Sequence, residues 1–193
     1  RAYSVEVEYG KKPARILDFT GIRIGIGLPL GDKAIAAAAA LARASDVAIV
    51  CVGRNGEWDT EGSDLENILL PGRQNELISA VAAVNKRTIV VLQTGGPIEM
   101  PWLDDVSGVL QAWYPGQAGG TALARILFGE VSPSGRLPVT FYRDVADLPA
   151  FEDYAMKNRT YRYFEGEALY PFGFGLSYSA FEYANAKVTN GEL

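Results

Sequence analysis

The residues best suited to chemistry form a short acidic loop behind an apolar segment. The run 47–52 predicts a buried strand, and the fifteen residues after it, 53–67, contain five carboxyl side chains and one tryptophan: Glu57, Trp58, Asp59, Glu61, Asp64 and Glu66. Functional groups gather at the carboxyl ends of strands in open α/β sheets, which makes this loop a candidate site. On composition alone, a solvated surface loop is the simplest interpretation. A calcium loop is disfavoured because the acids do not follow EF-hand spacing.

The sequence contains no histidine. This excludes a Ser-His-Asp or Cys-His site within the chain, and any metal bound through histidine. Proton transfer would depend on carboxylates, tyrosine or lysine. The single cysteine, Cys51, lies within the apolar run and is expected to be a small buried core residue rather than a reactive thiol. We expect no cofactor and no metal.

Composition limits the class of protein. The chain has 193 residues, of which 48% are hydrophobic and 21% charged, typical of a globular domain with a real core. The formal net charge of −5 argues against a nucleic-acid partner, which requires clustered Lys and Arg. No apolar run approaches the roughly 18 residues of a membrane-spanning helix.

Alternating apolar strands and helical segments predict the architecture. Helices are expected at 32–44, 72–85 and 116–129, with a short one near 99–103, and buried strands at 46–53, 88–93 and 108–113. Such βαβ units indicate a mostly parallel sheet covered on both faces, which is a three-layer α/β sandwich. Period-two alternation at 1–9, 14–19 and 181–188 predicts partial β elements at both ends.

Several motifs, in order along the chain, resemble those of family 3 glycoside hydrolases. They are Asn55-Gly-Glu-Trp-Asp-Thr-Glu-Gly-Ser-Asp64, Leu70-Pro-Gly-Arg-Gln-Asn-Glu-Leu-Ile78, Gln111-Ala-Trp-Tyr-Pro-Gly-Gln-Ala-Gly-Gly120, Leu127-Phe-Gly-Glu-Val-Ser-Pro-Ser-Gly-Arg-Leu-Pro138 and Tyr170-Pro-Phe-Gly-Phe-Gly-Leu-Ser-Tyr178. The resemblance implies that 28–180 form the α/β-sandwich domain of this family. It further implies that 1–27 end an inserted protective-antigen-type β-domain, and that 181–193 begin a fibronectin-III-like domain.

The resemblance also implies a role for Glu61 as general acid/base of a retaining exo-acting β-glycosidase. Such enzymes use two carboxyl groups about 5–5.5 Å apart, one attacking the anomeric carbon and one protonating the leaving oxygen. In this family the nucleophile is an aspartate on a TIM-type barrel that precedes this domain, so the chain alone is expected to be inactive. Trp58 could stack on a sugar in the leaving-group site or simply pack, and Glu57 is a weaker alternative acid.

The implied substrate is a β-glucoside or oligosaccharide with a terminal β-D-glucosyl residue, and β-xylosidase is the second activity. Two further classes stay open. The chain could be a non-catalytic carbohydrate-binding or structural module, which would bind sugar without the barrel. A flavodoxin-like nucleotide-binding domain is disfavoured because Gly25-Ile-Gly27, followed by Gly31, misses the spacing of the dinucleotide fingerprint.

Overall fold

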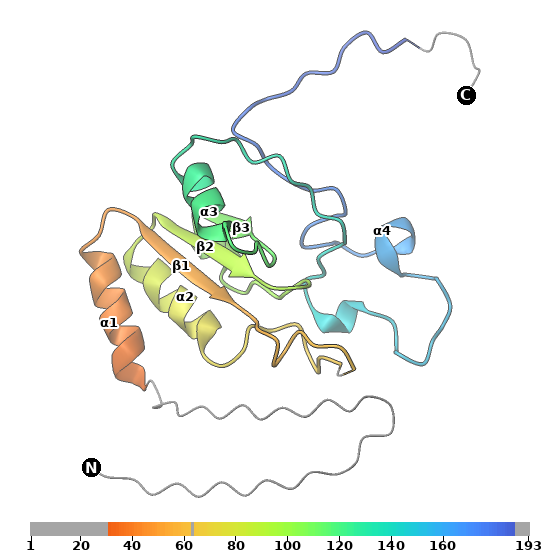
Figure 1. The fold of residues 1–193 in the computed structure, drawn as a ribbon. Helices are drawn as coiled ribbons and strands as arrows, with labels where there is room; N and C mark the ends of the chain where they lie inside the picture. The colour runs from red at the N-terminus through yellow and green to blue at the C-terminus, as the bar shows by residue number, and fades with distance from the viewer. Residues whose placement is uncertain (1–30, 63, 188–193) are drawn as a thin grey trace, which may run out of the picture. The chain divides into compact units, whose positions relative to one another are not determined.

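The computed structural model of the chain describes residues 31–62 and 64–187 (Figure 1). All the elements below belong to one compact unit within residues 32–193. The β elements expected at 1–9 and 14–19, and the boundary of the β-domain expected at 1–27, lie outside the described residues.

The centre of the fold is a three-stranded parallel sheet in the order β1-β2-β3. Strand β1 spans Ala48–Gly53, β2 spans Thr88–Gln93 and β3 spans Gly108–Gln111. The register aligns Gly53 with Gln93, so β1 and β2 end side by side at one edge. Because all three strands run in the same direction, the loops that follow them gather at this carboxyl edge.

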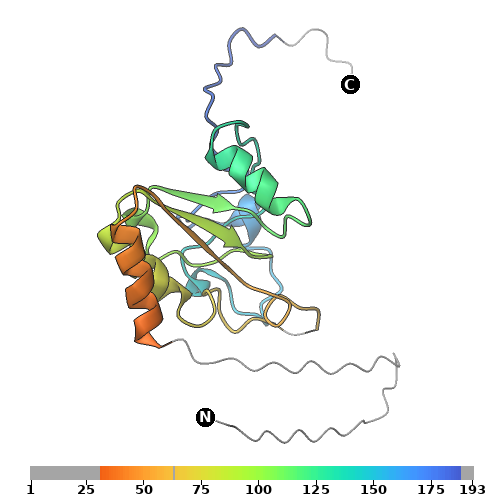
Figure 2. The same cartoon turned by 60° about the vertical axis from the view of Figure 1, so that its left-hand side comes forward.

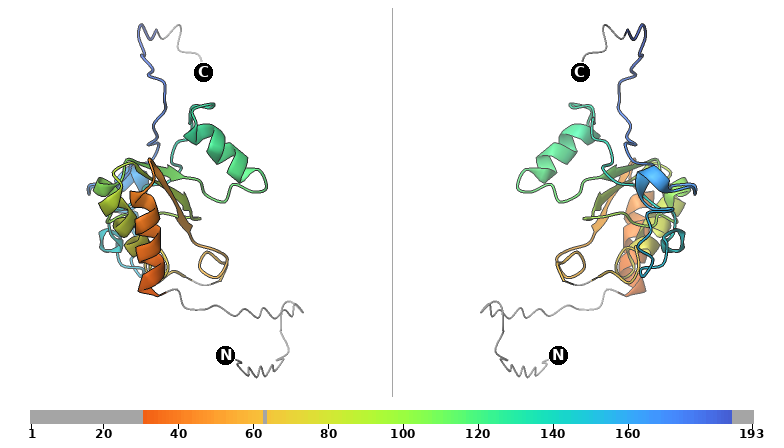
Figure 3. Two further views of the ribbon diagram at one scale, coloured as in Figure 1. Left: turned by 90° about the vertical axis from the view of Figure 1, so that its left-hand side faces the viewer. Right: turned by 90° about the vertical axis from the view of Figure 1, so that its right-hand side faces the viewer.

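Helices lie on both sides of the sheet. Helix α1, Asp32–Arg43, and helix α2, Gln74–Val84, lie against each other on one face (Figures 1 and 2). Helix α3, Gly119–Leu127, lies on the opposite side (Figure 3). The three-layer α/β arrangement predicted from the sequence is therefore confirmed. Within the described part of the chain, no helix combines the length and apolarity needed to cross a membrane.

The hydrophobic core fills the space between the sheet and the pair α1 and α2. Val90 and Leu92 of β2 and Ile78 of α2 are completely buried there, because alternate strand residues point to the same face. Trp102 closes one side of this core, and its indole N–H donates to Asn75 Oδ1 at 2.8 Å. The loops at the carboxyl edge of the sheet therefore start from strands whose inner face is packed in this core.

The expectation that Cys51 is a buried core residue is wrong, because Cys51 is exposed. Burial alternates along β1: Ala48, Val50 and Val52 are buried toward the helices, whereas Ile49, 48% exposed, lies with Cys51 on the other face. An apolar run predicts a strand, but it does not tell whether helices cover both of its faces when the strand lies at the edge of the sheet. Here the outer face of β1 is largely uncovered.

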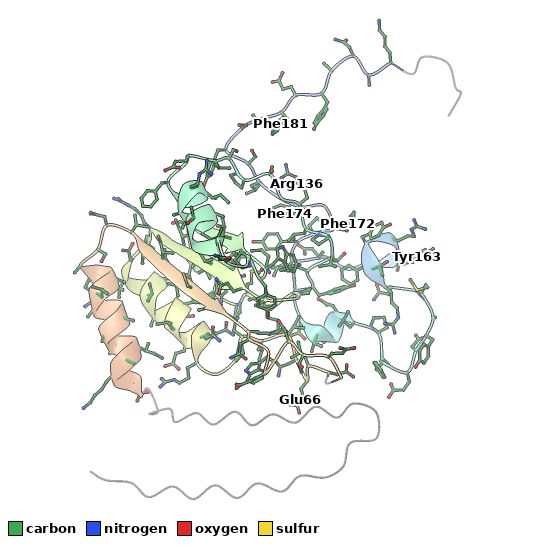
Figure 4. The ribbon with its side chains drawn as sticks, in the orientation of Figure 1. Glu66, Arg136, Tyr163, Phe172, Phe174 and Phe181 are labelled. Carbon is green, nitrogen blue, oxygen red and sulfur yellow. The ribbon has the colours of Figure 1, made fainter. Side chains whose placement is uncertain are left out.

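Short helices and aromatic segments complete the described chain. The short helices are η1 (Leu103–Asp105), η2 (Val145–Asp147) and α4 (Thr160–Tyr163). Segments 137–141 and 170–174 run together, since Phe141 and Tyr170 exchange backbone hydrogen bonds and Leu137 donates to Phe174 O at 2.8 Å. Phe174, labelled in Figure 4, belongs to this pairing, and its ring stacks on Tyr170 with centroids 4.7 Å apart.

The strand expected at 181–188 is absent from its described part, residues 181–187. A strand needs a neighbouring strand for its backbone hydrogen bonds, and these residues have none within the described part of the chain. The boundary proposed for a fibronectin-III-like domain at 181–193 therefore stays a prediction.

Candidate functional site

The acidic loop starts from a fixed point at the end of β1. Gly53 donates its N–H to Gln74 Oε1 at 2.7 Å, and Gln74 Nε2 donates back to Gly53 O at 2.9 Å and to Pro71 O at 3.1 Å. A glycine is required here, because a Cβ at position 53 would lie 2.1 Å from Gln93 O. The start of α2 therefore holds the beginning of the loop at the end of β1, where Gly53 passes close to Gln93 of β2.

Arg54 links the two ends of the loop. Its side chain is 1% exposed, and its Nη2 donates to Leu69 O at 2.9 Å. Its Nη1 lies 3.6 Å from Asp59 Oδ1, and its buried Nε has no hydrogen-bond partner in the described structure. A guanidinium buried to this extent requires a nearby anion to offset the loss of hydration, and the Asp59 carboxylate provides it.

The Asp59 carboxylate is the point where the three strand ends meet. Its Oδ2 accepts the Gly95 N–H at 2.7 Å and the Tyr114 O–H at 2.5 Å. Arg54 follows β1, Gly95 follows β2 and Tyr114 follows β3. Although Tyr114 is 52% exposed, partial desolvation of its hydroxyl raises its pKa, and the hydrogen bond to Asp59 raises it further, because both disfavour a phenolate at this position.

A turn within the loop exposes Trp58. Asn55 Oδ1 accepts the Glu57 N–H at 2.9 Å, and Asn55 O accepts the N–H groups of Trp58 at 2.9 Å and Asp59 at 3.0 Å. The Trp58 side chain is 46% exposed and lines an open depression of about 330 Å³ with Gln74, among other residues. An exposed indole beside a hollow of this size is suited to stacking on a sugar ring.

Glu61 lies two residues beyond Asp59 and is exposed. Its carboxylate has no hydrogen bond or ion pair with another described residue, so a group from outside this chain can reach it. Gly62 follows with φ of 79°, a backbone conformation that favours glycine and turns the chain directly after Glu61. Glu57 is also exposed, and Glu66, labelled in Figure 4, lies further along the same loop.

The structure thus places all three predicted site residues, Glu57, Trp58 and Glu61, on one loop at the carboxyl edge of the sheet. Of these, only Trp58 lines the depression. No cluster of three or more metal-binding side chains occurs among the residues that the structure describes.

The residues that hold the loop were not identified from the sequence. They are Arg54, Gln74, Gly95 and Tyr114. Three of them come within three residues of the end of a strand. The available signal is that residues directly after parallel strands converge at one edge of the sheet, where Arg54 and Tyr114 use side chains and Gly95 uses its backbone N–H. Gln74, as the first residue of α2, gives no such signal.

Comparisons with known proteins find relatives in sequence and in fold. The sequence model described as "Glycosyl hydrolase family 3 C-terminal domain" matches residues 3–178. A β-glucosidase of Rhizobium radiobacter is 48% identical over all of this chain and 26% of its own length. A xylan 1,4-β-xylosidase of Xylanibacter ruminicola is 49% identical over 69% of this chain and 16% of its own length. The crystal structure of the Kluyveromyces marxianus β-glucosidase with glucose superposes with a TM-score of 0.76 and 41% identity, covering 81% of this chain and 20% of that one.

The chain therefore spans about a quarter of the length of the curated relatives that it matches over its full extent.

Proposed function

Because this chain belongs to the glycosyl hydrolase family 3 C-terminal domain family, we propose that it is part of a longer retaining β-glucosidase and supplies that enzyme with its general acid/base, Glu61. The nucleophile is an aspartate on a TIM-type barrel outside these residues. The observation that carries the proposal is the exposed Glu61 carboxylate, which lies without a partner among the described residues on a loop held at the carboxyl edge of the sheet.

The reaction has two steps. In the first, the barrel carboxylate attacks the anomeric carbon while Glu61 donates its proton to the glycosidic oxygen, so that the C–O bond breaks and the sugar stays covalently bound. In the second, the Glu61 carboxylate removes a proton from water, and the water oxygen displaces the barrel carboxylate.

The substrate is a β-glucoside or oligosaccharide with a terminal β-D-glucosyl residue. The full-coverage β-glucosidase relatives favour glucosides over xylosides, because the matched xylosidase covers only 69% of the chain. In this proposal Trp58 contacts the leaving-group sugar, and its exposure beside the depression next to the loop supports that role.

The test compares Glu61→Ala with Glu57→Ala in the longer protein that contains the barrel. Glu61→Ala should lower kcat/KM for cellobiose by about 10²–10⁴-fold, whereas Glu57→Ala, on the same exposed loop, should change it much less. With an activated aryl β-glucoside, Glu61→Ala should release the phenol in a burst. Added azide should then accelerate turnover, because azide needs no base to attack the glycosyl intermediate.

Normal turnover of cellobiose by Glu61→Ala, or a stronger effect of Glu57→Ala, would remove Glu61 from this role. The 193-residue chain alone should not hydrolyse an aryl β-glucoside. If the chain alone instead binds glucose or cellobiose in a titration and Glu61→Ala leaves turnover unchanged, the carbohydrate-binding module becomes the better assignment.

A further inference from the structure

We propose that Asp59 is a positioning residue for proton transfer by Glu61. Its carboxylate fastens the acid/base loop to the ends of all three strands and so fixes where the Glu61 carboxyl group meets the glycosidic oxygen. This inference rests on the function proposed above for Glu61.

The first argument is the convergence of partners on one carboxylate. Asp59 receives the Gly95 N–H at 2.7 Å and the Tyr114 O–H at 2.5 Å on one oxygen, and the Arg54 guanidinium lies 3.6 Å from the other. These partners follow three different strands, and Asp59 is only 15% exposed at its side chain, although the loop residues on both sides of it are exposed. Hydrogen bonds that involve charged groups are stronger than neutral ones, so this is a firm attachment.

The second argument is that, among the described residues, no other hydrogen bond to a distant part of the chain lies as close to Glu61. Only Thr60 separates it from Asp59, and two residues of chain span at most about 7 Å. Beyond Glu61, the next hydrogen bond from the described loop to a distant part of the chain is at Ile68, whose carbonyl accepts the Glu99 N–H at 3.0 Å. The attachment at Asp59 therefore controls the position of Glu61 more directly than any other described contact.

The third argument is chemical. A general acid must come within about 2.6–3.2 Å of the atom that it protonates, and a displacement of about 1 Å can lower the rate about 100-fold. A loosened loop should reduce turnover most for substrates with a basic leaving group, which depend on proton donation. Substrates whose leaving group departs as a stable anion should be affected little.

The experiment measures kcat/KM of the longer enzyme with Asp59→Asn and Tyr114→Phe on two substrates, cellobiose and 2,4-dinitrophenyl β-glucoside. Asp59→Asn should lower the value for cellobiose by about 10–100-fold and that for the activated glucoside by less than about threefold. Tyr114→Phe removes one hydroxyl and should show the same selectivity with a smaller effect. The control is Glu66→Gln, an exposed carboxylate of the same loop, which should match the parent enzyme on both substrates.

If both variants lose kcat/KM equally on the two substrates, Asp59 and Tyr114 only maintain the fold, and the inference is overturned. The inference would also be overturned if the Asp59 and Tyr114 variants kept the parent enzyme's kcat/KM for cellobiose. Glu61→Ala measured in parallel separates the two proposals. If Glu61→Ala shows the leaving-group dependence and the Asp59 and Tyr114 variants do not, only the positioning role fails. If Glu61→Ala keeps cellobiose turnover, the proposed function fails and this inference fails with it.

Discussion

Removing the Asp59 carboxylate should destabilise the chain chiefly by leaving a buried charge without its counter-ion. The Arg54 side chain is 1% exposed, and the carboxylate 3.6 Å away is its charged partner. In Asp59→Ala, the guanidinium keeps its hydrogen bond to Leu69 O, but it loses the carboxylate that offsets its lost hydration. The Gly95 and Tyr114 donors, by contrast, are at exposed positions and can bond to water.

The size of this loss of stability follows from how deeply the Arg54 and Asp59 side chains are buried. Breaking a buried ion pair by removing one partner typically costs about 3–5 kcal/mol. The lower end, about 3 kcal/mol, applies here because Asp59 is 15% exposed and the pair is long, so water can partly replace the carboxylate. The double variant Arg54→Met/Asp59→Ala removes both charges and keeps most of the side-chain volume. It should recover most of the loss, because an apolar pair of similar volume is often as stable as a buried ion pair.

Urea unfolding of the 193-residue chain measures the loss of unfolding free energy in the single variant and its recovery in the double variant. With a slope of about 2 kcal/mol/M, a loss of about 3 kcal/mol lowers the midpoint by about 1.5 M at unchanged slope. The reasoning would be refuted by a single variant that loses less than about 1 kcal/mol, or by a double variant no more stable than the single one. Either result would mean that Arg54 does not depend on Asp59.

Three further predictions use the chain itself. Gly53→Ala should lower the free energy of unfolding in urea by about 2 kcal/mol or more, because its Cβ would lie 2.1 Å from Gln93 O. The control Gly56→Ala, which has open space around it, should stay within about 0.5 kcal/mol of the parent. Equal losses in the two variants would contradict the close approach at Gly53. The raised pKa of Tyr114 means that its stabilising contribution is present below about pH 10 and is lost as pH rises through the folded value. The unfolding free energy of the parent chain should therefore fall more steeply above pH 10 than that of Tyr114→Phe, and parallel curves would exclude this linkage. Because Cys51 is exposed, a thiol reagent should label the native chain at about the rate seen in urea, and strong protection would indicate that the outer face of β1 is covered.

The local pattern of the sequence determined the elements and their type. The apolar run at 88–93 predicts β2 with both of its ends, and helical spacing places α2 within two residues of its observed bounds. Alternation of such segments requires crossover connections and hence parallel strands, which the sheet has. The acidic loop was found in the same way, from neighbouring residues after a strand, whereas Glu61 was proposed within it because its motif resembles that of family 3 glycoside hydrolases.

Only the tertiary structure decided what holds that loop. Asp59 meets Gly95 and Tyr114, which lie 36 and 55 positions away in the sequence, and these contacts depend on strand order and register. The same holds for Cys51: its apolar neighbours predict a strand, but its exposure depends on whether another layer covers that face of the sheet. Periodicity reports which residues share a face of one element, because that is fixed by local backbone geometry. Which distant groups meet at that face depends on how the elements pack against one another, and the local pattern does not determine that packing.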